Sequence, residues 1–443
     1  MFPNMLAIML IGNIDPENSA LILAGYGQSD VIQGIIANVL LGAVVGSLST
    51  LCSQAYGGKR YQEMWMFIQA SMLMFLAALP ALMTALLFGE RMLLAMGQDA
   101  AIAAVAGKLF RLQLVQMPLD AVFMMLQMVL QAQNITRPLL PATIVAWSIC
   151  LPLAYFLGST LSLGYMGVSA ALALTAGIKF LVMLPALRST DEFLTTWPGW
   201  KLKEAAQLVP RVLKLSLPMA FLLTFQTLDF SVMSLMAGLL PNPAVMVTAD
   251  SIYMATISMA FLAPSAIMMV GIVRIGNALG AGQAKRASLA SRVVIGMCVG
   301  AATIGMLVLI PVSPKFARTV TPDEEAIKVA MHIFRSLIVL IPLMGLSFGL
   351  LSVFIAAGKQ MLSAKLSFLL QFGVGMPLAY VAAMHLHGGL LGVWIGNLMG
   401  TIVFVIASVT WWMNVSWSKL AHEAHMNTHL HLNDAQAEPE PVV

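Results

Sequence analysis

Two carboxylates, Asp120 and Asp229, lie deep inside long apolar stretches of the chain. A charged side chain within a membrane span is costly, so an acid in such a place is a candidate functional residue. In a low-dielectric site it could take up and release a proton near neutral pH, which is what a proton-coupled carrier requires. It could also help to hold Na⁺ or a cationic substrate. Asp229 is our main candidate for proton or ion coupling, and Asp120 is secondary.

The sequence around Asp229 favours protons over Na⁺. Gln226 lies three residues earlier, on the same face of a helix, and Ser231 is close in sequence but turned away. Na⁺ would need several further oxygens, and only Gln226 can be placed beside the acid. Gln226 and Ser231 are candidates for a substrate cavity. The alternative is a purely structural Asp229 that a neighbouring helix satisfies.

Asp120 belongs to a polar stripe with spacings of 3, 4, 7 and 4 residues, which places its members along one face of a helix. Lipid cannot satisfy four amides and an acid, so this face should look into protein or a wet cavity. A structural polar seam between helices is the alternative. The members are Gln113, Gln116, Asp120, Gln127 and Gln131.

The composition requires a membrane environment around these residues. Hydrophobic residues make up 60% of the 443 positions and charged residues only 9%, whereas soluble domains carry roughly 25% charged residues. The apolar runs are about 20 residues long and do not alternate, which indicates membrane-spanning helices. The net charge of +4 is small, and the basic residues do not cluster as nucleic-acid binding would require.

The predicted architecture is an all-α polytopic membrane protein with twelve helices. The first has only some 12 apolar residues where about 20 are needed to span a bilayer, so we expect a truncated first helix and a chain that begins part-way through it. The predicted ranges are 1–12, 31–52, 64–88, 110–133, 139–161, 165–187, 212–238, 245–271, 288–312, 331–357, 363–385 and 388–414.

Two motifs recur at nearly the same offset and indicate an internal repeat. Residues 54–60 (QAYGGKR) resemble 277–282 (NALGAG), and 164–168 (GYMGV) resemble 389–393 (GLLGV). A long apolar chain built twice over is typical of a secondary transporter, with its site between the halves. We therefore predict an N-lobe over 1–187 and a C-lobe over 212–414. A charged linker over 188–211 should join them.

The positive-inside rule places the linker and the polar tail, 415–443, in the cytoplasm. His422, His425, His429 and His431 in this tail could ligate a metal, but a disordered tail is the preferred interpretation. No phosphate-binding glycine loop and no catalytic triad or zinc motif is present in the sequence. We therefore expect no metal, no cofactor and no enzymatic activity, with transport driven by an ion gradient.

Several motifs resemble the multidrug and toxic compound extrusion (MATE) family, in its eukaryotic-type branch. They are 50–57 (TLCSQAYG), 130–133 (LQAQ), 238–243 (GLLPNP) and 274–282 (RIGNALGAG). The resemblance implies two six-helix lobes related by a pseudo-twofold axis, a V-shaped cavity, and export of organic cations against H⁺ or Na⁺. It suggests a monomer in the plasma membrane or an endomembrane such as the vacuole. The motif positions expected to have a structural role are Gln54, Tyr56, Gly57, Pro241, Arg274, Asn277 and Gly280.

The chain departs from the family pattern at its acidic positions. Two glutamates usual in the seventh helix correspond to Gln226 and Ser231, with Asp229 between them, and two further acids correspond to Met344 and Ser49. Three hypotheses follow. The first is an antiporter of organic cations that uses Asp229. The second is an uncoupled carrier, and the third is a non-transporting membrane paralogue that has lost the coupling acids.

Overall fold

A computed structural model describes residues 10, 19–37, 43–95, 97–137, 139–188, 195–321 and 323–428. Regular secondary structure in these ranges is entirely helical, which confirms the predicted all-α class. Ten of the helical segments are long and apolar enough to span a membrane. The chain forms two compact units, each described here by itself: unit 1 comprises 1–48 and 64–216, and unit 2 comprises 49–63 and 217–443.

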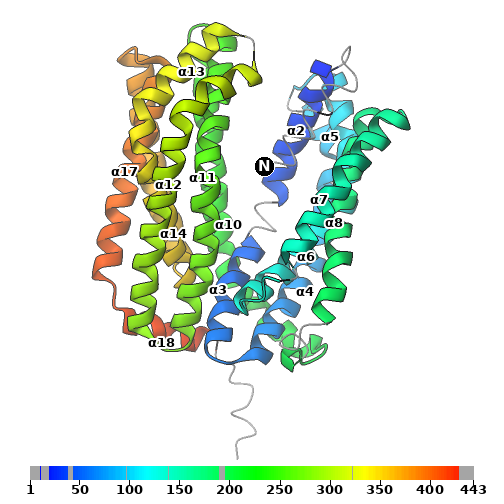
Figure 1. Ribbon diagram of the computed structural model, residues 1–443, viewed down its shortest axis with the longest axis vertical. Coiled ribbons are helices and arrows are strands. Elements are labelled where there is room, and N and C mark those ends of the chain that lie inside the picture. The colour runs from blue at the N-terminus through cyan, green and yellow to red at the C-terminus, as the bar shows by residue number, and fades with distance from the viewer. Residues whose placement is uncertain are drawn as a thin grey trace, which may run out of the picture. The chain divides into compact units, whose positions relative to one another are not determined.

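In unit 1, the long helix α6 (Ala100–Ala132) packs against α2, α5 and α8, and α7 packs against α8 (Figure 1). Asp99 caps α6, since its side chain accepts hydrogen bonds from the backbone N–H groups of Ala101 and Ile102. The other elements are α2 (Ser19–Ala37), the start of α3 (Ala43–Gly57), most of α4 (Tyr61–Leu87), α5 (Gly89–Ala95), α7 (Leu139–Tyr155), the π-helical turn η2 (Phe156–Thr160), α8 (Gly164–Arg188) and the start of α10 (Leu202–Gly238).

In unit 2, α11 (Pro243–Gly280), α12 (Ala284–Val320) and α14 (Ile341–Ala356) pack against one another, and α17 (Gly389–Asn414) packs against α14 (Figure 1). A core of buried apolar side chains joins the end of α10 to α11, α12, α13 and α17. The remaining elements are α13 (Glu324–Leu337), η3 (Ile338–Leu340), α15 (Gln360–Ser367), η4 (Phe368–Gly375), α16 (Met376–Tyr380), η5 (Val381–His385) and α18 (Trp417–Thr428).

The helix boundaries differ from the prediction near the start of the chain. The helix predicted over 31–52 corresponds to α2, which begins at Ser19, and α3, which ends at Gly57; residues 38–42 lie outside the described ranges. The predicted truncated helix over 1–12 also lies outside them, except for Leu10, so it stays a prediction.

The predicted linker is largely ordered. α10 begins at Leu202, so the second part of the predicted 188–211 segment is helical. The residues before it dock on α4, where Gln69 Nε2 donates to the Gly199 carbonyl at 2.8 Å and Gln69 Oε1 accepts from the Lys201 backbone N–H at 2.7 Å. The buried Gln69 amide thus has partners for both its nitrogen and its oxygen, and these bonds hold the segment on α4 within unit 1.

The polar tail also differs from the predicted disorder, because its first part forms α18. Leu420, Ala421 and Ala424 are buried on one side of this helix, which packs against α11 and α12. Lys359 pairs with Glu423 at 2.8 Å. The polarity of the tail favours disorder, but these few apolar residues at helical spacing suffice to dock it. His429 and His431 lie outside the described residues, within which no group of His, Cys, Asp or Glu side chains could hold a metal.

Candidate functional site

Asp229 on α10 is held by two amide side chains from elsewhere in unit 2. Asn397 Nδ2, on α17, donates to both carboxylate oxygens at 3.0 and 2.9 Å. Gln371 Nε2, on the π-helical segment η4, donates to Oδ2 at 3.3 Å. Asp229 is 7% exposed, so its carboxylate is satisfied mainly by these amides, and it joins three separate helical elements.

Thr401 also takes part in this hydrogen-bonded group. Its hydroxyl accepts a hydrogen bond from Gln371 Nε2 at 3.3 Å. The same hydroxyl donates to the backbone carbonyl of Asn397, one helical turn earlier, at 3.2 Å. The amide oxygen of Gln371 is buried and has no hydrogen-bond donor among the described residues. We call Asp229, Gln371, Asn397 and Thr401 the C-unit polar cluster. Its carboxylate, amides and hydroxyl offer both proton-binding and cation-binding chemistry.

The local backbone explains how Gln371 reaches Asp229. Gln371 lies in η4, where eight residues adopt π-helical geometry. A π-segment rotates side chains away from the positions that a regular α-helix would give them, and such segments often occur at functional sites. Asn397 and Thr401 are four residues apart on α17, so they share a face of that helix.

The two residues predicted to accompany Asp229 lie elsewhere. Gln226 and Ser231 are exposed, and the Ser231 hydroxyl donates to the Thr227 carbonyl of its own helix at 2.9 Å. Asp229 bonds instead to residues 142 and 168 positions away in sequence. Polar residues in the last two apolar runs could have indicated these partners, but nothing in the sequence assigns them to Asp229.

The structure brings together part of the predicted stripe on α6. Gln116 Nε2 donates to Asp120 Oδ2 at 3.2 Å. Gln113 is buried, and its Oε1 has no donor among the described residues. Gln127 and Gln131 are half-buried and make no side-chain hydrogen bond within the described ranges. Lys179 on α8 is a further charged residue within a span of this unit. The sequence-based candidates are acids and polar uncharged residues, so they do not include this lysine.

The two copies of the repeated glycine motif contact each other within unit 2. The end of α3 lies against the end of α11, so that a Cβ on Gly57 would overlap the backbone of Asn277. Gln54 is fully buried, and its Nε2 donates to the Ala356 carbonyl at the end of α14 at 2.8 Å. The Tyr56 ring lies 5.5 Å from that of Tyr61.

Two further motif positions, Pro241 and Arg274, lie at the surface. Pro241 precedes Asn242, which adopts a left-handed conformation with φ of 56° as α11 begins. Both residues are exposed, as is Arg274 near the other end of α11.

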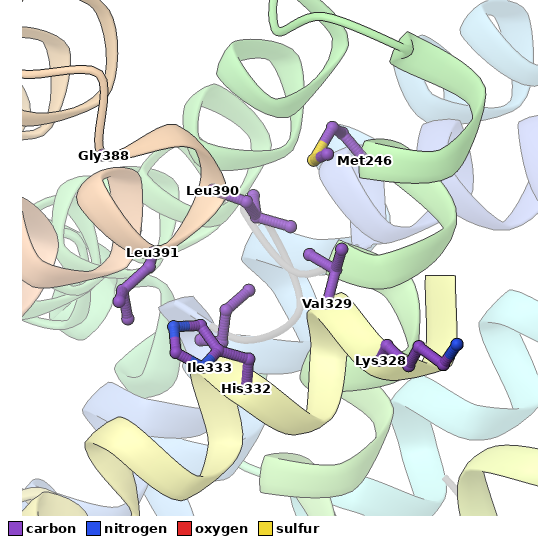
Figure 2. Close-up of a pocket in the computed structure, with 8 residues that line it drawn as sticks. All are labelled: Met246, Lys328, Val329, His332, Ile333, Gly388, Leu390 and Leu391. Carbon is purple, nitrogen blue, oxygen red and sulfur yellow. The ribbon is translucent and has the colours of Figure 1, made fainter. Parts of the chain in front are cut away.

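A separate apolar cavity of about 330 Å³ lies in unit 2 between α11, α13 and α17. Figure 2 shows the side chains that line it, with the His332 imidazole pointing toward Leu391. No member of the C-unit polar cluster lines this cavity, so we do not assign the candidate ion site to it. Its lining consists of Met246, Lys328, Val329, His332, Ile333, Gly388, Leu390 and Leu391.

Comparison with known proteins decides the family. The family model described as MatE matches residues 1–156 and 218–381, which is most of the chain. The chain belongs to the MatE family. This confirms the resemblance inferred from the motifs. MatE proteins are transporters and not enzymes, so the chain is an integral multi-pass membrane transporter related to multidrug and toxic compound efflux proteins.

The MatE relatives include eukaryotic proteins from a plant and a yeast. Protein DETOXIFICATION 16 of Arabidopsis thaliana is 26% identical over 426 residues, covering 95% of this chain and 85% of that protein. The uncharacterized transporter C323.07c of Schizosaccharomyces pombe is 26% identical over 416 residues, covering 92% and 76%.

Solved MatE structures share the fold. The crystal structure of the eukaryotic MATE transporter AtDTX14 superimposes with a TM-score of 0.88 at 20% identity, over 97% of this chain and 94% of that one. The Vibrio cholerae MATE transporter VcmN in its bent form gives a TM-score of 0.82 at 17% identity, over 96% and 94%. At these identities the likeness concerns the fold alone, and it agrees with the predicted polytopic helical class.

Proposed function

We propose that this chain is a secondary active antiporter that exports organic cations in exchange for H⁺, with Na⁺ as the alternative coupling ion. Membership of the MatE family supports the transport of small organic compounds. The observation that carries the coupling is the carboxylate of Asp229, which is buried inside a helical membrane protein and bonded to Asn397 and Gln371. Such an acid is the expected place for a transported ion to bind.

Ion binding at Asp229 changes the contact between three helical elements. The ionised carboxylate accepts hydrogen bonds from Asn397 on α17 and Gln371 on η4. A protonated acid gains an O–H donor and is a weaker acceptor than the carboxylate, so the hydrogen bonds from the two amides weaken or rearrange. Proton uptake therefore biases the packing of α10 against η4 and α17. Such a bias shifts the equilibrium between two transporter conformations only if the ion binds them unequally.

The arrangement of the amides favours H⁺ over Na⁺. Both present N–H groups, and not oxygens, to Asp229, so neither amide is a Na⁺ ligand in this arrangement. Na⁺ would need both amides turned so that their oxygens join those of Asp229 and Thr401.

Two other functions keep support from the sequence. Gln226, Ser231, Met344 and Ser49 occupy places where relatives of this family usually carry acids. An uncoupled carrier, or a membrane paralogue that no longer transports, would follow from their loss.

The deciding experiment measures uptake of a fluorescent organic cation into proteoliposomes with and without an imposed pH gradient. We expect gradient-driven uptake that Asp229→Asn abolishes and that Glu325→Gln, which neutralises an exposed acid at the start of α13, leaves within twofold. Equilibration that ignores the gradient would favour the uncoupled carrier. No flux in any variant would favour the non-transporting paralogue.

We further propose that Asp120 with Gln116 contributes to the substrate cavity, together with Gln113, Gln127 and Gln131 as sequence-based candidates. Their grouping on α6 supports this role. We also propose a monomer in the plasma membrane or an endomembrane, with its C-terminus in the cytoplasm, as the distribution of basic residues favours. Reporter fusions at the C-terminus and light scattering of the purified protein test these points.

A further inference from the structure

A lysine within a membrane span of unit 1 lies over two aromatic rings. Lys179 Nζ on α8 is 5.4 Å from the ring centroid of Trp147 on α7 and 5.6 Å from that of Phe123 on α6. Helix α8 packs against both α6 and α7, so the three side chains meet inside one helical group. We call Phe123 and Trp147 the aromatic box.

The lysine lies well inside its helix. Lys179 precedes Arg188, the last residue of α8, by nine residues, or about 13 Å along the axis. Trp147 lies eight residues into α7 and Asp120 twelve residues before the end of α6, so all three occupy similar depths. A lysine near the end of a span can extend to the interface. At this depth a charged group marks a candidate functional site.

The ammonium of Lys179 makes no hydrogen bond and no ion pair with any residue that the structure describes, and its charge is opposite to that of Asp120 in the same unit. The rings are therefore its main direct contacts. Lys179, Trp147 and Asp120 are all half-buried, so the group is not sealed.

Two aromatic rings around an ammonium form the arrangement by which proteins recognise quaternary ammonium ligands. Here the position of the ligand is filled by a side chain of the protein. We propose that Lys179 is a specificity-determining residue, whose tethered ammonium occupies the aromatic box and competes with organic cations for it. The proposal rests on the proposed function in one respect, since it takes organic cations as the substrate class.

The charge balance leads to the same expectation. With Lys179 present, its charge offsets that of Asp120, and a monovalent cation gains little by entering. Without it, the aromatic box and an uncompensated carboxylate remain, which together suit a permanently charged cation. Lys179 therefore lowers the affinity of unit 1 for such ligands. Only cations that can displace the Lys179 ammonium from the aromatic box bind there.

The test is binding of radiolabelled tetraethylammonium to the purified full-length protein in detergent. We expect Lys179→Met to raise the affinity about tenfold, in line with the strength of a desolvated cation–π contact. Lys179→Arg, which keeps the charge, should stay within twofold of the wild type. The matched control is Lys108→Met, which removes an exposed lysine from α6 and should have no effect.

The double variant Lys179→Met/Trp147→Leu identifies the box as the binding place, because it should lose the gained affinity. Thermal unfolding of each variant verifies that it is folded. Unchanged or weaker binding in folded Lys179→Met, binding in neither protein, or a gain that persists without Trp147 would overturn the proposal. These results are independent of the pH-gradient assay, because equilibrium binding needs no coupling through Asp229. Gradient-independent flux together with tighter binding by Lys179→Met would refute the proposed antiport alone.

Discussion

Gly280 lies so close to Gln54 that a Cβ on Gly280 would overlap the Gln54 carbonyl oxygen. The reciprocal contact places Gly57 against the carbonyl of Asn277. Each motif copy thus supplies a glycine to the backbone of the other, and the end of α3 packs directly on the end of α11. Because backbone meets backbone, neither partner can turn aside to admit a side chain.

Gly280→Ala is therefore expected to destabilise the protein by about 1–3 kcal/mol, the usual range for overpacking a close contact. The matched control is Gly296→Ala on the exposed face of α12, where a Cβ would meet nothing within 4 Å. That substitution should be neutral or stabilising by up to about 1 kcal/mol through helix propensity. Thermal unfolding in detergent compares the two, and equal stabilities would contradict the contact.

Trp394→Phe should also destabilise unit 2, by about 1–3 kcal/mol. Asp250 is 2% exposed, and its Oδ1 accepts a 2.9 Å hydrogen bond from Trp394 Nε1. Loss of the indole N–H leaves a buried carboxyl group short of a donor, which costs its desolvation.

The control for this experiment is Trp412→Phe, which removes a 3.0 Å bond from Trp412 Nε1 to the hydroxyl of Ser291. The Ser291 hydroxyl is buried but neutral, so loss of this bond should cost about 1 kcal/mol or less. If both variants lower the unfolding temperature equally, the hydrogen bond to Asp250 contributes no more to stability than the bond to Ser291.

The helical class, and the choice of Asp229 as a candidate residue, could be predicted from the sequence because both depend on local composition. An acid in a long apolar run is visible without a structure, whereas its partners Asn397 and Gln371 lie 168 and 142 residues away. Their choice depends on how α10, η4 and α17 pack, and on the π-helical geometry around Gln371. These are tertiary features that no local pattern encodes.

Local sequence patterns also failed to predict the start of α6 and the contact between the two glycine motifs. Lys108 interrupts the apolar run shortly before 110, where the predicted helix begins, yet Asp99 caps α6 eleven residues earlier than 110. The similarity of residues 54–60 to 277–282 indicated equivalent places in two repeats. Contact between the two copies does not follow from that similarity, because a repeat gives correspondence and not proximity.

Thr401→Val separates H⁺ coupling from Na⁺ coupling. The substitution keeps the volume of the side chain and removes the one hydroxyl of the C-unit polar cluster. If the cluster exchanges a proton, transport driven by a pH gradient should fall less than threefold and added Na⁺ should have no effect. Flux in proteoliposomes is measured over a series of Na⁺ concentrations at fixed pH. A large rise in the Na⁺ concentration needed for half-maximal flux would instead identify Thr401 as a Na⁺ ligand.

Apolar packing, more than its ion pair, should hold α18 on unit 2. Leu420 is 3% exposed, and Leu420→Ala should cost about 2–3 kcal/mol through lost burial and the cavity left behind. The side chains of Lys359 and Glu423 are 34% and 31% exposed, and a pair so open to solvent contributes about 0–1 kcal/mol. Glu423→Gln should therefore have a much smaller effect. Limited proteolysis reports the docking of α18 directly, because an undocked helix is cleaved faster while the rest of the chain stays intact. Faster cleavage of Glu423→Gln than of Leu420→Ala would reverse this order and assign the docking to the charged pair.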